Sequence, residues 1–231
     1  SSIPSNPLSY KDAEPILRAL EGPATPHGWQ GALPFAYHLG GTNAVTVHMD
    51  LQQDYARRTI WDVIGKVPGT EDGDNWVIAG NHRDAWVDGA VDTSSGTAAM
   101  LETVHGIGDL LKQGWRPKRT ILFASWDAEE EGLIGSTEWV EQHAAELSHA
   151  VAYFNTDVGV AGPDFNADAD PSLKDFLRDI TKDVASPKGG TVYEQWKLAQ
   201  QAAVATHSIS TNAPASAPHV EYEPQIGNLG S

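Results

Sequence analysis

Residues 79–96 read AGNHRDAWVDGAVDTSSG and directly follow a short apolar run, WVI. His82 stands just beyond that run, and Asp92 comes ten residues later, ahead of a Thr-Ser-Ser-Gly turn. A lone histidine beside Arg and Asp is more often part of a surface turn than a metal ligand. The stretch therefore indicates a site only if other parts of the chain bring further ligands to it.

Two more apolar runs end in acidic side chains. TILFAS precedes Glu129 and Glu130, and AVAYFN precedes Asp157. An open α/β sheet binds small molecules and ions beyond the carboxyl ends of its strands. We therefore expect these side chains to converge on His82. On turn backbone the adjacent glutamates diverge, which lets one bind metal while the other faces water. The alternative for this acidic run is a solvated turn at a helix N-terminus.

Histidine and carboxylates are the metal ligands that this chain offers. It contains no cysteine, so neither a disulfide framework nor a thiolate zinc cluster is possible. Asp84, two residues after His82, is placed to accept the other ring N–H and thereby fix the tautomer of the ring. The pattern favours a metal site over a set of unrelated acidic turns.

Apolar periodicity predicts alternating strands and helices, and hence an α/β fold. The first two expected strands alternate as if they pair with each other. An Ala-, Ser-, Thr- and Pro-rich stretch over residues 199–218 is expected to be irregular. The expected helices cover residues 10–20 (with Ser9 as the cap), 97–111, 137–147 and 173–184, and the expected strands cover 44–50, 59–67, 76–79, 119–125 and 150–155.

The composition is that of one large acidic domain. The 231 residues are 40% hydrophobic, and 31 Asp and Glu against 15 Lys and Arg give a net charge of −16. This charge argues against a partner held through phosphates, so nucleic acid is not an expected ligand. The chain has no run of about eighteen apolar residues, and its first residues lack the pattern of a signal peptide.

Five motifs resemble the zinc exopeptidases related to glutamate carboxypeptidase, the N-acetylated-alpha-linked acidic dipeptidases, which share a fold with the transferrin receptor. The motifs are long, and they extend over nearly the whole chain. The resemblance implies a three-layer α/β sandwich with a mixed, mostly parallel central sheet flanked by helices, truncated at the C-terminus. The motifs are GNHRDAW (80–86), DTSSG (92–96), GWRPKRTILFASWDAEE (114–130), GLIGSTEW (132–139) and NTD (155–157).

The resemblance also implies a site with two Zn²⁺ ions. His82 and Asp157 would bind one zinc, and Glu130 would bind the other. Asp92 would bridge the two, and Glu129 falls on the position of the general base. Such a pair activates a water molecule and polarises a peptide carbonyl. The expected activity is hydrolysis of short peptides, of the carboxypeptidase or dipeptidase type.

The family pattern is longer than this chain at both ends. Residues 1–25 resemble the return from a protease-associated domain, and residues 26–231 resemble an incomplete catalytic domain. A fifth ligand, a histidine, and a domain that forms a homodimer would follow. Glu138 and Glu141, one helical turn apart, match two ligands of a structural Ca²⁺ site. Secretion, periplasmic export or a membrane-anchored ectodomain would suit the family, and no residue here decides between them.

Substrate preference is where the resemblance weakens. Glutamate-selective relatives carry an arginine shortly after the Asn-x-Asp motif, and residues 158–171 contain none. An aminopeptidase of the same fold is therefore one alternative. A non-catalytic scaffold like the transferrin receptor is another, and loss of metal ligands would be its signature. Every ligand position that the chain covers keeps a metal-binding residue, so we expect a zinc metallopeptidase.

Overall fold

The structure is a computed structural model of the 231-residue chain. For residues 204–211 it describes the backbone alone. No helix in the described ranges is long and apolar enough to cross a lipid bilayer. The described ranges are residues 5–40, 45–160, 162–211 and 223–228.

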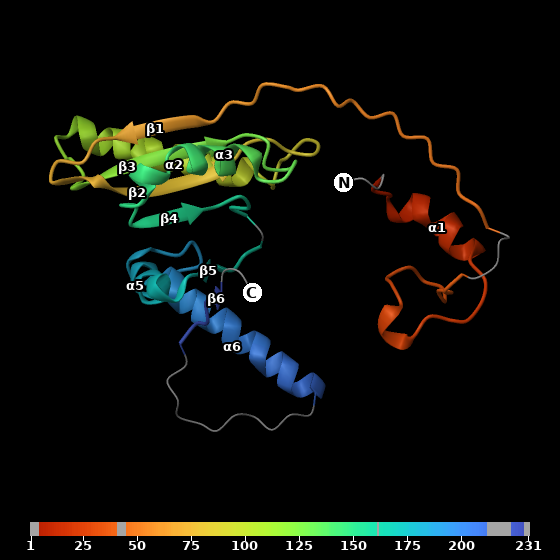
Figure 1. The fold of residues 1–231 in the computed structure, drawn as a ribbon. Helices are drawn as coiled ribbons and strands as arrows, with labels where there is room; N and C mark the ends of the chain where they lie inside the picture. Colours follow the sequence, from red (N-terminus) through yellow and green to blue (C-terminus); the bar gives the residue numbers. More distant parts are fainter. Residues whose placement is uncertain (1–4, 41–44, 161, 212–222, 229–231) are drawn as a thin grey trace. The chain divides into compact units, whose positions relative to one another are not determined.

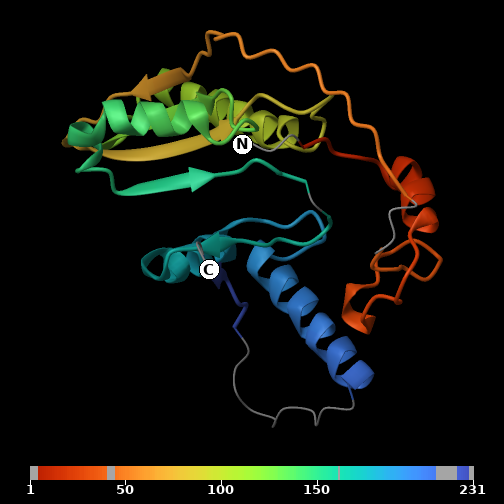
Figure 2. The same cartoon turned by 45° about the vertical axis from the view of Figure 1, so that its right-hand side comes forward.

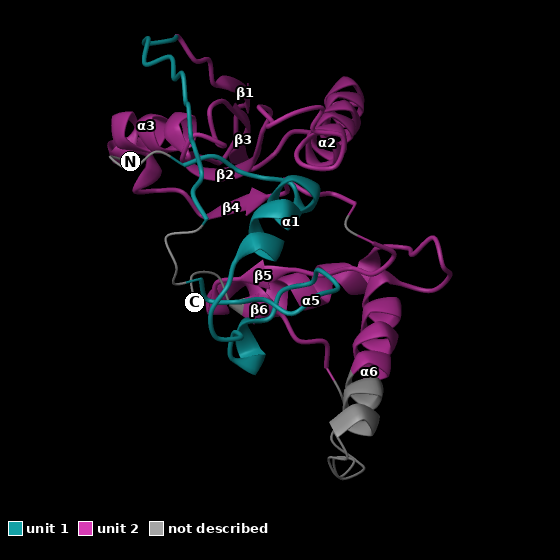
Figure 3. Ribbon diagram, turned by 90° about the vertical axis from the view of Figure 1, so that its right-hand side faces the viewer, with its two compact units in different colours: residues 1–58 teal, residues 59–231 magenta. Residues whose placement is uncertain are grey.

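The chain divides into two compact units, residues 1–58 and residues 59–231 (Figure 3). The first contains α1 (Tyr10–Ala19), which is capped by Ser9, as predicted. The Ser9 hydroxyl accepts the N–H of Asp12 at 3.2 Å, and this hydrogen bond satisfies one of the free amides at the helix start.

The predicted strand over residues 44–50 is wrong for its described part, and residue 44 lies outside the described residues. Residues 45–62 contain no helix or strand. The side chains of Val47 and Met49 are more than half exposed. An alternating pattern stabilises a strand only when a partner strand pairs with it, and the predicted partner pairs elsewhere.

The second unit is built on a four-stranded sheet of order β1-β3-β2-β4 (Figure 1). β2 pairs in parallel with both β3 and β4, and β1 pairs antiparallel with β3. The predicted mixed, mostly parallel sheet is therefore confirmed. The strands are β1 (Val63–Val67), β2 (Asp72–His82), β3 (Arg119–Trp126) and β4 (Ala152–Asn155).

Helices cover both faces of this sheet, as the three-layer prediction required. α2 (Ser94–Lys112) and α3 (Ile134–Gln142) lie on opposite sides of the strands (Figure 3). The predicted helix over residues 137–147 starts earlier and is interrupted at His143, so that α4 (Ala144–Leu147) is separate. The main core of the unit lies on the α3 side of the sheet, and Trp139 of α3 packs against it. Its buried members are Ile78, Leu122, Ala124 and Trp126.

A smaller cluster lies at the C-terminal end of the second unit. Trp196 is 1% exposed and packs with Ala169 and Ile226. Figure 2 shows the two helices of this part, α5 and α6, and the two-stranded β5-β6 pair. The elements are β5 (Asp168–Ala169), a 3₁₀ turn (Pro171–Leu173), α5 (Lys174–Asp183), α6 (Val192–Thr211) and β6 (Gly227–Asn228).

The prediction of an irregular segment over residues 199–218 is wrong for residues 199–211, which belong to α6. The helix starts with a reciprocal cap: the Thr191 hydroxyl accepts the Glu194 N–H, and the Glu194 carboxylate accepts the Thr191 N–H. The alanines that follow have the highest intrinsic helix propensity. Residues 212–218 lie outside the described residues.

A close contact joins the start of α2 to the loop after β4. A Cβ atom on Gly96 would lie 1.6 Å from the main-chain oxygen of Thr156, and one on Gly159 would lie 2.9 Å from the main-chain oxygen of Ser95. Only glycine permits such an approach of two backbones. The contact holds the loop after β2 against the loop after β4.

Gly96→Ala should therefore destabilise the protein, by about 2–3 kcal/mol, because the new methyl group must push the two backbones apart. Gly106→Ala is the matched control in the same helix, where nothing lies within 4 Å of an added Cβ. That control should gain about 0.5–1 kcal/mol from helix propensity. Urea unfolding of the two variants measures the difference, and equal stabilities would contradict the close contact.

Candidate metal centre

The three parallel strands end at one edge of the sheet, and the predicted ligands follow those ends. His82 is the last residue of β2 and is 3% exposed. Glu129 and Glu130 lie in the turn after β3, and Asp157 lies two residues after β4. The structure brings one ligand atom from each of His82, Glu129 and Glu130 within 4.8 Å of one another.

The ring of His82 is oriented by its own loop. Its Nδ1 lies 2.9 Å from the main-chain oxygen of Asp84. A carbonyl oxygen only accepts, so Nδ1 carries the hydrogen and Nε2 is the nitrogen available to a metal. Nε2 faces the carboxylates, 3.0 Å from Asp92 Oδ1 and 3.8 Å from Glu129 Oε2.

Two buried polar residues that the sequence analysis missed hold the backbone of His82. The Thr93 hydroxyl donates to the main-chain oxygen of His82 at 2.8 Å. The Asn81 side-chain amide donates to the hydroxyls of Thr93 and Thr97, at 3.1 and 2.7 Å. Asn81 is completely buried. These contacts join β2 to the start of α2, and no periodicity in the sequence points to them.

Asp84 contacts different atoms from those predicted. We expected its carboxylate to accept the ring N–H of His82, but the main-chain oxygen of Asp84 lies closer to that nitrogen, and Oδ1 is 3.6 Å away. The carboxylate instead accepts two backbone amides, from Glu129 at 3.0 Å and from Glu130 at 3.1 Å. One side chain from the loop after β2 thus fixes the backbone of both glutamates.

The turn that carries these glutamates has an unusual backbone. Ala128 has φ +54°, in the left-handed region that a residue with a side chain adopts at a cost of about 1 kcal/mol or more. The charged hydrogen bonds from the Glu129 and Glu130 amides to Asp84 offset this cost. The turn directs two adjacent side chains toward the edge of the sheet where His82 lies.

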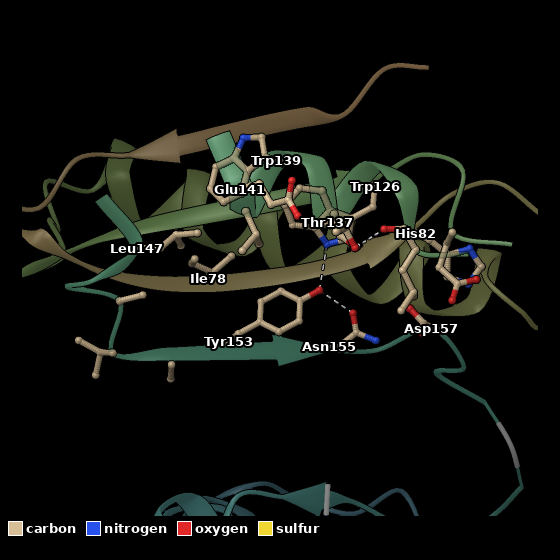
Figure 4. Close-up of a pocket in the computed structure, with 17 residues that line it drawn as sticks. Ile78, His82, Trp126, Thr137, Trp139, Glu141, Leu147, Tyr153, Asn155 and Asp157 are labelled. Atoms are coloured by element: carbon tan, nitrogen blue, oxygen red, sulfur yellow. Dashed lines mark hydrogen bonds and ion pairs between the residues drawn. The ribbon is translucent and has the colours of Figure 1, made fainter. Parts of the chain in front are cut away.

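Asp92 and Asp157 reach the same edge through a link between their loops. Asp92 forms an isolated antiparallel bridge with Val158, the neighbour of Asp157. Figure 4 shows Asp157 and His82 at the same end of a cavity of about 730 Å³. Its other end runs along β4 between apolar side chains, including Trp139 and Leu147.

Negative charge dominates the electrostatics of the site. Burial alone would lower the pKa of His82, but Asp157, the Asp84 carbonyl, Glu129 and Asp92 together raise it. The pKa of Glu129 is also raised. Burial is the main cause, and the charges of Glu130, Asp157 and Asp84 add to it, against the opposing effect of His82.

This donor set fits a divalent metal ion. Five carboxylates lie around His82, and among the described residues they form ion pairs with His82 alone. A single imidazole cannot balance so many converging carboxylates, and imidazole nitrogen with carboxylate oxygen suits zinc. The five carboxylates are those of Asp84, Asp92, Glu129, Glu130 and Asp157.

The predicted calcium ligands, Glu138 and Glu141, lie one turn apart on α3 and are exposed. Within the described ranges, the one group of three or more possible metal ligands is that around His82. A calcium site on α3 therefore stays a prediction.

A sheet edge that gathers a histidine and several carboxylates is the arrangement of a metal-binding α/β protein. The chain belongs to peptidase family M28, whose model matches residues 62–212. The family resemblance that the motifs indicated is thereby confirmed.

Curated relatives agree with this assignment. The chain is 46% identical over 198 residues to the probable glutamate carboxypeptidase VP8 of Zea mays, and 42% identical over 211 residues to the aminopeptidase NAALADL1 of Mus musculus. Each match covers 84% of this chain and 28% of the relative, so the chain spans little more than a quarter of their length. A solved peptidase M28 precursor from Shewanella amazonensis SB2B matches with 29% identity and a TM-score of 0.44, covering 52% of this chain and 27% of that one.

Asp84→Asn should weaken zinc binding about 10- to 100-fold, because an amide group cannot accept both backbone N–H groups and the turn that carries the glutamates loosens. Asp88→Asn, at an exposed position of the same loop, removes the same charge without touching that turn. Titration with zinc against a chromophoric chelator measures both affinities. If the two variants weaken binding equally, the effect is one of net charge and not of the hydrogen bonds.

Proposed function

We propose that this chain carries the co-catalytic site of a two-zinc exopeptidase that cleaves peptide bonds of short peptides. The convergence of His82, Glu129 and Glu130 at one edge of the sheet is the observation that carries the proposal. His82 and Asp157 would hold one zinc ion and Glu130 the other. Asp92, within 3.0 Å of the His82 nitrogen, would bridge the pair.

When bound, two zinc ions supply a water of lowered pKa and a Lewis acid for the substrate carbonyl. The protein's own residues must then move the proton. Glu129 is suited to this step because its backbone is fixed by Asp84 and its carboxylate faces the histidine. The raised pKa of Glu129 brings this carboxylate closer to the pKa of an efficient base.

Glu129 would take a proton from the attacking water and return it to the leaving nitrogen as the peptide bond breaks. Both transfers need a carboxyl group within hydrogen-bond reach that is not itself a metal ligand. Glu130, held by the same Asp84 carboxylate, would serve as the ligand. The two adjacent residues would thus take two roles, with the backbone of both held by Asp84.

Carboxypeptidases and aminopeptidases cleave from opposite ends of a peptide, and the proposed function has to distinguish them. We propose a carboxypeptidase or dipeptidase, in line with the relatives named as probable glutamate carboxypeptidases, although another relative is named as an aminopeptidase. Dipeptides blocked at the amino end and aminoacyl amides with a free amino end separate these activities. Cleavage of the amides alone would favour the aminopeptidase.

A homodimer and a structural calcium ion at Glu138 and Glu141 are further proposals that rest on the family.

Glu129→Gln tests the mechanism directly. The variant should keep its zinc, since Glu129 is not one of the proposed ligands, and should lose at least about 100-fold in kcat, because the amide cannot accept the proton. Zinc content by atomic absorption and turnover of the blocked dipeptides are measured on the same sample.

Glu131→Gln is the matched control, an exposed neighbour that removes the same charge. It should leave turnover unchanged. Near-normal turnover in Glu129→Gln, or loss of its zinc, would contradict the assigned role. Bound zinc with no turnover of any peptide in the unmodified protein would favour a non-catalytic scaffold.

A further inference from the structure

A chain of side-chain hydrogen bonds crosses the sheet from β3 to β4. The indole Nε1 of Trp126 donates to the hydroxyl of Tyr153 at 2.9 Å, and that hydroxyl donates to Asn155 Oδ1 at 2.7 Å (Figure 4). Trp126 is the last residue of β3, and Asn155 is the last residue of β4. β2 runs between these strands, so the hydrogen-bond chain passes over β2.

Gly80 of β2 makes the crossing possible. It pairs with Ala124 of β3 and with Asn155 of β4 in the ladder, which places it beneath the hydrogen-bond chain. A Cβ atom at Gly80 would lie 2.9 Å from both Trp126 Nε1 and the Tyr153 hydroxyl. That distance is shorter than carbon permits without displacing one of the two groups. Any side chain here would separate the tryptophan from the tyrosine.

The direction of the hydrogen bonds is fixed by chemistry. An indole N–H can only donate, so the Tyr153 oxygen accepts and its own hydrogen is left to donate to Asn155. Trp126 is 5% exposed, so its N–H would be costly to leave without a partner. Burial, together with the nearby charge of Asp157, raises the pKa of Tyr153 and keeps its hydroxyl protonated.

The two ends of this series of hydrogen bonds lie a few residues before the proposed metal-site residues. Trp126 is followed within four residues by Glu129 and Glu130, and Asn155 is followed by Asp157 two residues later. The ring of Trp139 packs 5.4 Å from that of Trp126 and restrains one end. The main-chain ladder connects β3 and β4 only through β2, whereas the hydroxyl of Tyr153 connects them directly.

We propose that Tyr153 is a positioning residue whose hydroxyl, held over Gly80 between Trp126 and Asn155, sets the separation of Glu129 and Glu130 from Asp157. This inference rests on the proposed function, because it matters only if those side chains serve one metal centre. Tyr153 is not one of the proposed metal ligands. It acts through the strand ends that it joins.

Tyr153→Phe tests the inference, because it removes the hydroxyl and keeps the ring. Zinc affinity is measured by competition with a chromophoric chelator, with folding checked by circular dichroism and urea unfolding. The variant should stay folded and bind zinc about 10- to 100-fold more weakly, as is typical when a group that orients ligands is lost. Tyr193→Phe removes the same atom from a tyrosine that packs under Lys182 and should leave zinc affinity unchanged.

Gly80→Ala is the second variant, and it separates Trp126 from Tyr153 without altering either. It should weaken zinc binding to a similar degree, and the double variant with Tyr153→Phe should be no weaker than the single ones, because both break the same connection. Zinc affinity of Tyr153→Phe equal to that of the unmodified protein, or fully additive losses in the double variant, would overturn the inference. If the unmodified protein itself binds no zinc, the proposed function fails instead.

Discussion

Parallel pairing of β2 with both of its neighbours brings three carboxyl-terminal strand ends to one edge of the sheet. Each end is followed within a few residues by acidic side chains, and the buried His82 stands in the middle strand. An antiparallel neighbour would carry its ligands to the opposite edge, about 20 Å away for a strand of ordinary length. The remaining contacts of the site refine a convergence that the strand directions already impose.

The cost of that convergence is electrostatic. Carboxylates that gather around one imidazole repel one another: burial raises the pKa of Glu129, and the charges of Glu130, Asp157 and Asp84 raise it further. The protein uses Asp84 for hydrogen bonds to two backbone amides, which satisfies that charge locally. Within the described part of the chain, the other four carboxylates form no ion pair except with His82. A divalent cation is the natural complement to such a group.

Much of this arrangement could be predicted from the sequence, because strand ends and ligand types are local features. The positions of His82, Glu129 and Glu130 after apolar runs indicated the convergence that the structure contains. Contacts between distant residues could not be predicted. No spacing of residues in the sequence indicates that Asp84 accepts the backbone amide of Glu129, or that side chains form a hydrogen bond over Gly80. The Ala-, Ser- and Thr-rich composition of residues 199–211 predicts irregular structure, but a cap at Thr191 starts a helix that continues through them.

The strand order β1-β3-β2-β4 also governs how the chain can assemble during synthesis. β1 and β2 are made first, but they do not pair with each other. Both pair with β3, which begins only at Arg119. While residues 83–118 are made, neither strand has a partner in this sheet. Non-local pairing of this kind slows folding and exposes strands to association with other chains. The second edge of β2 stays without its partner for longer still, until β4 has been made.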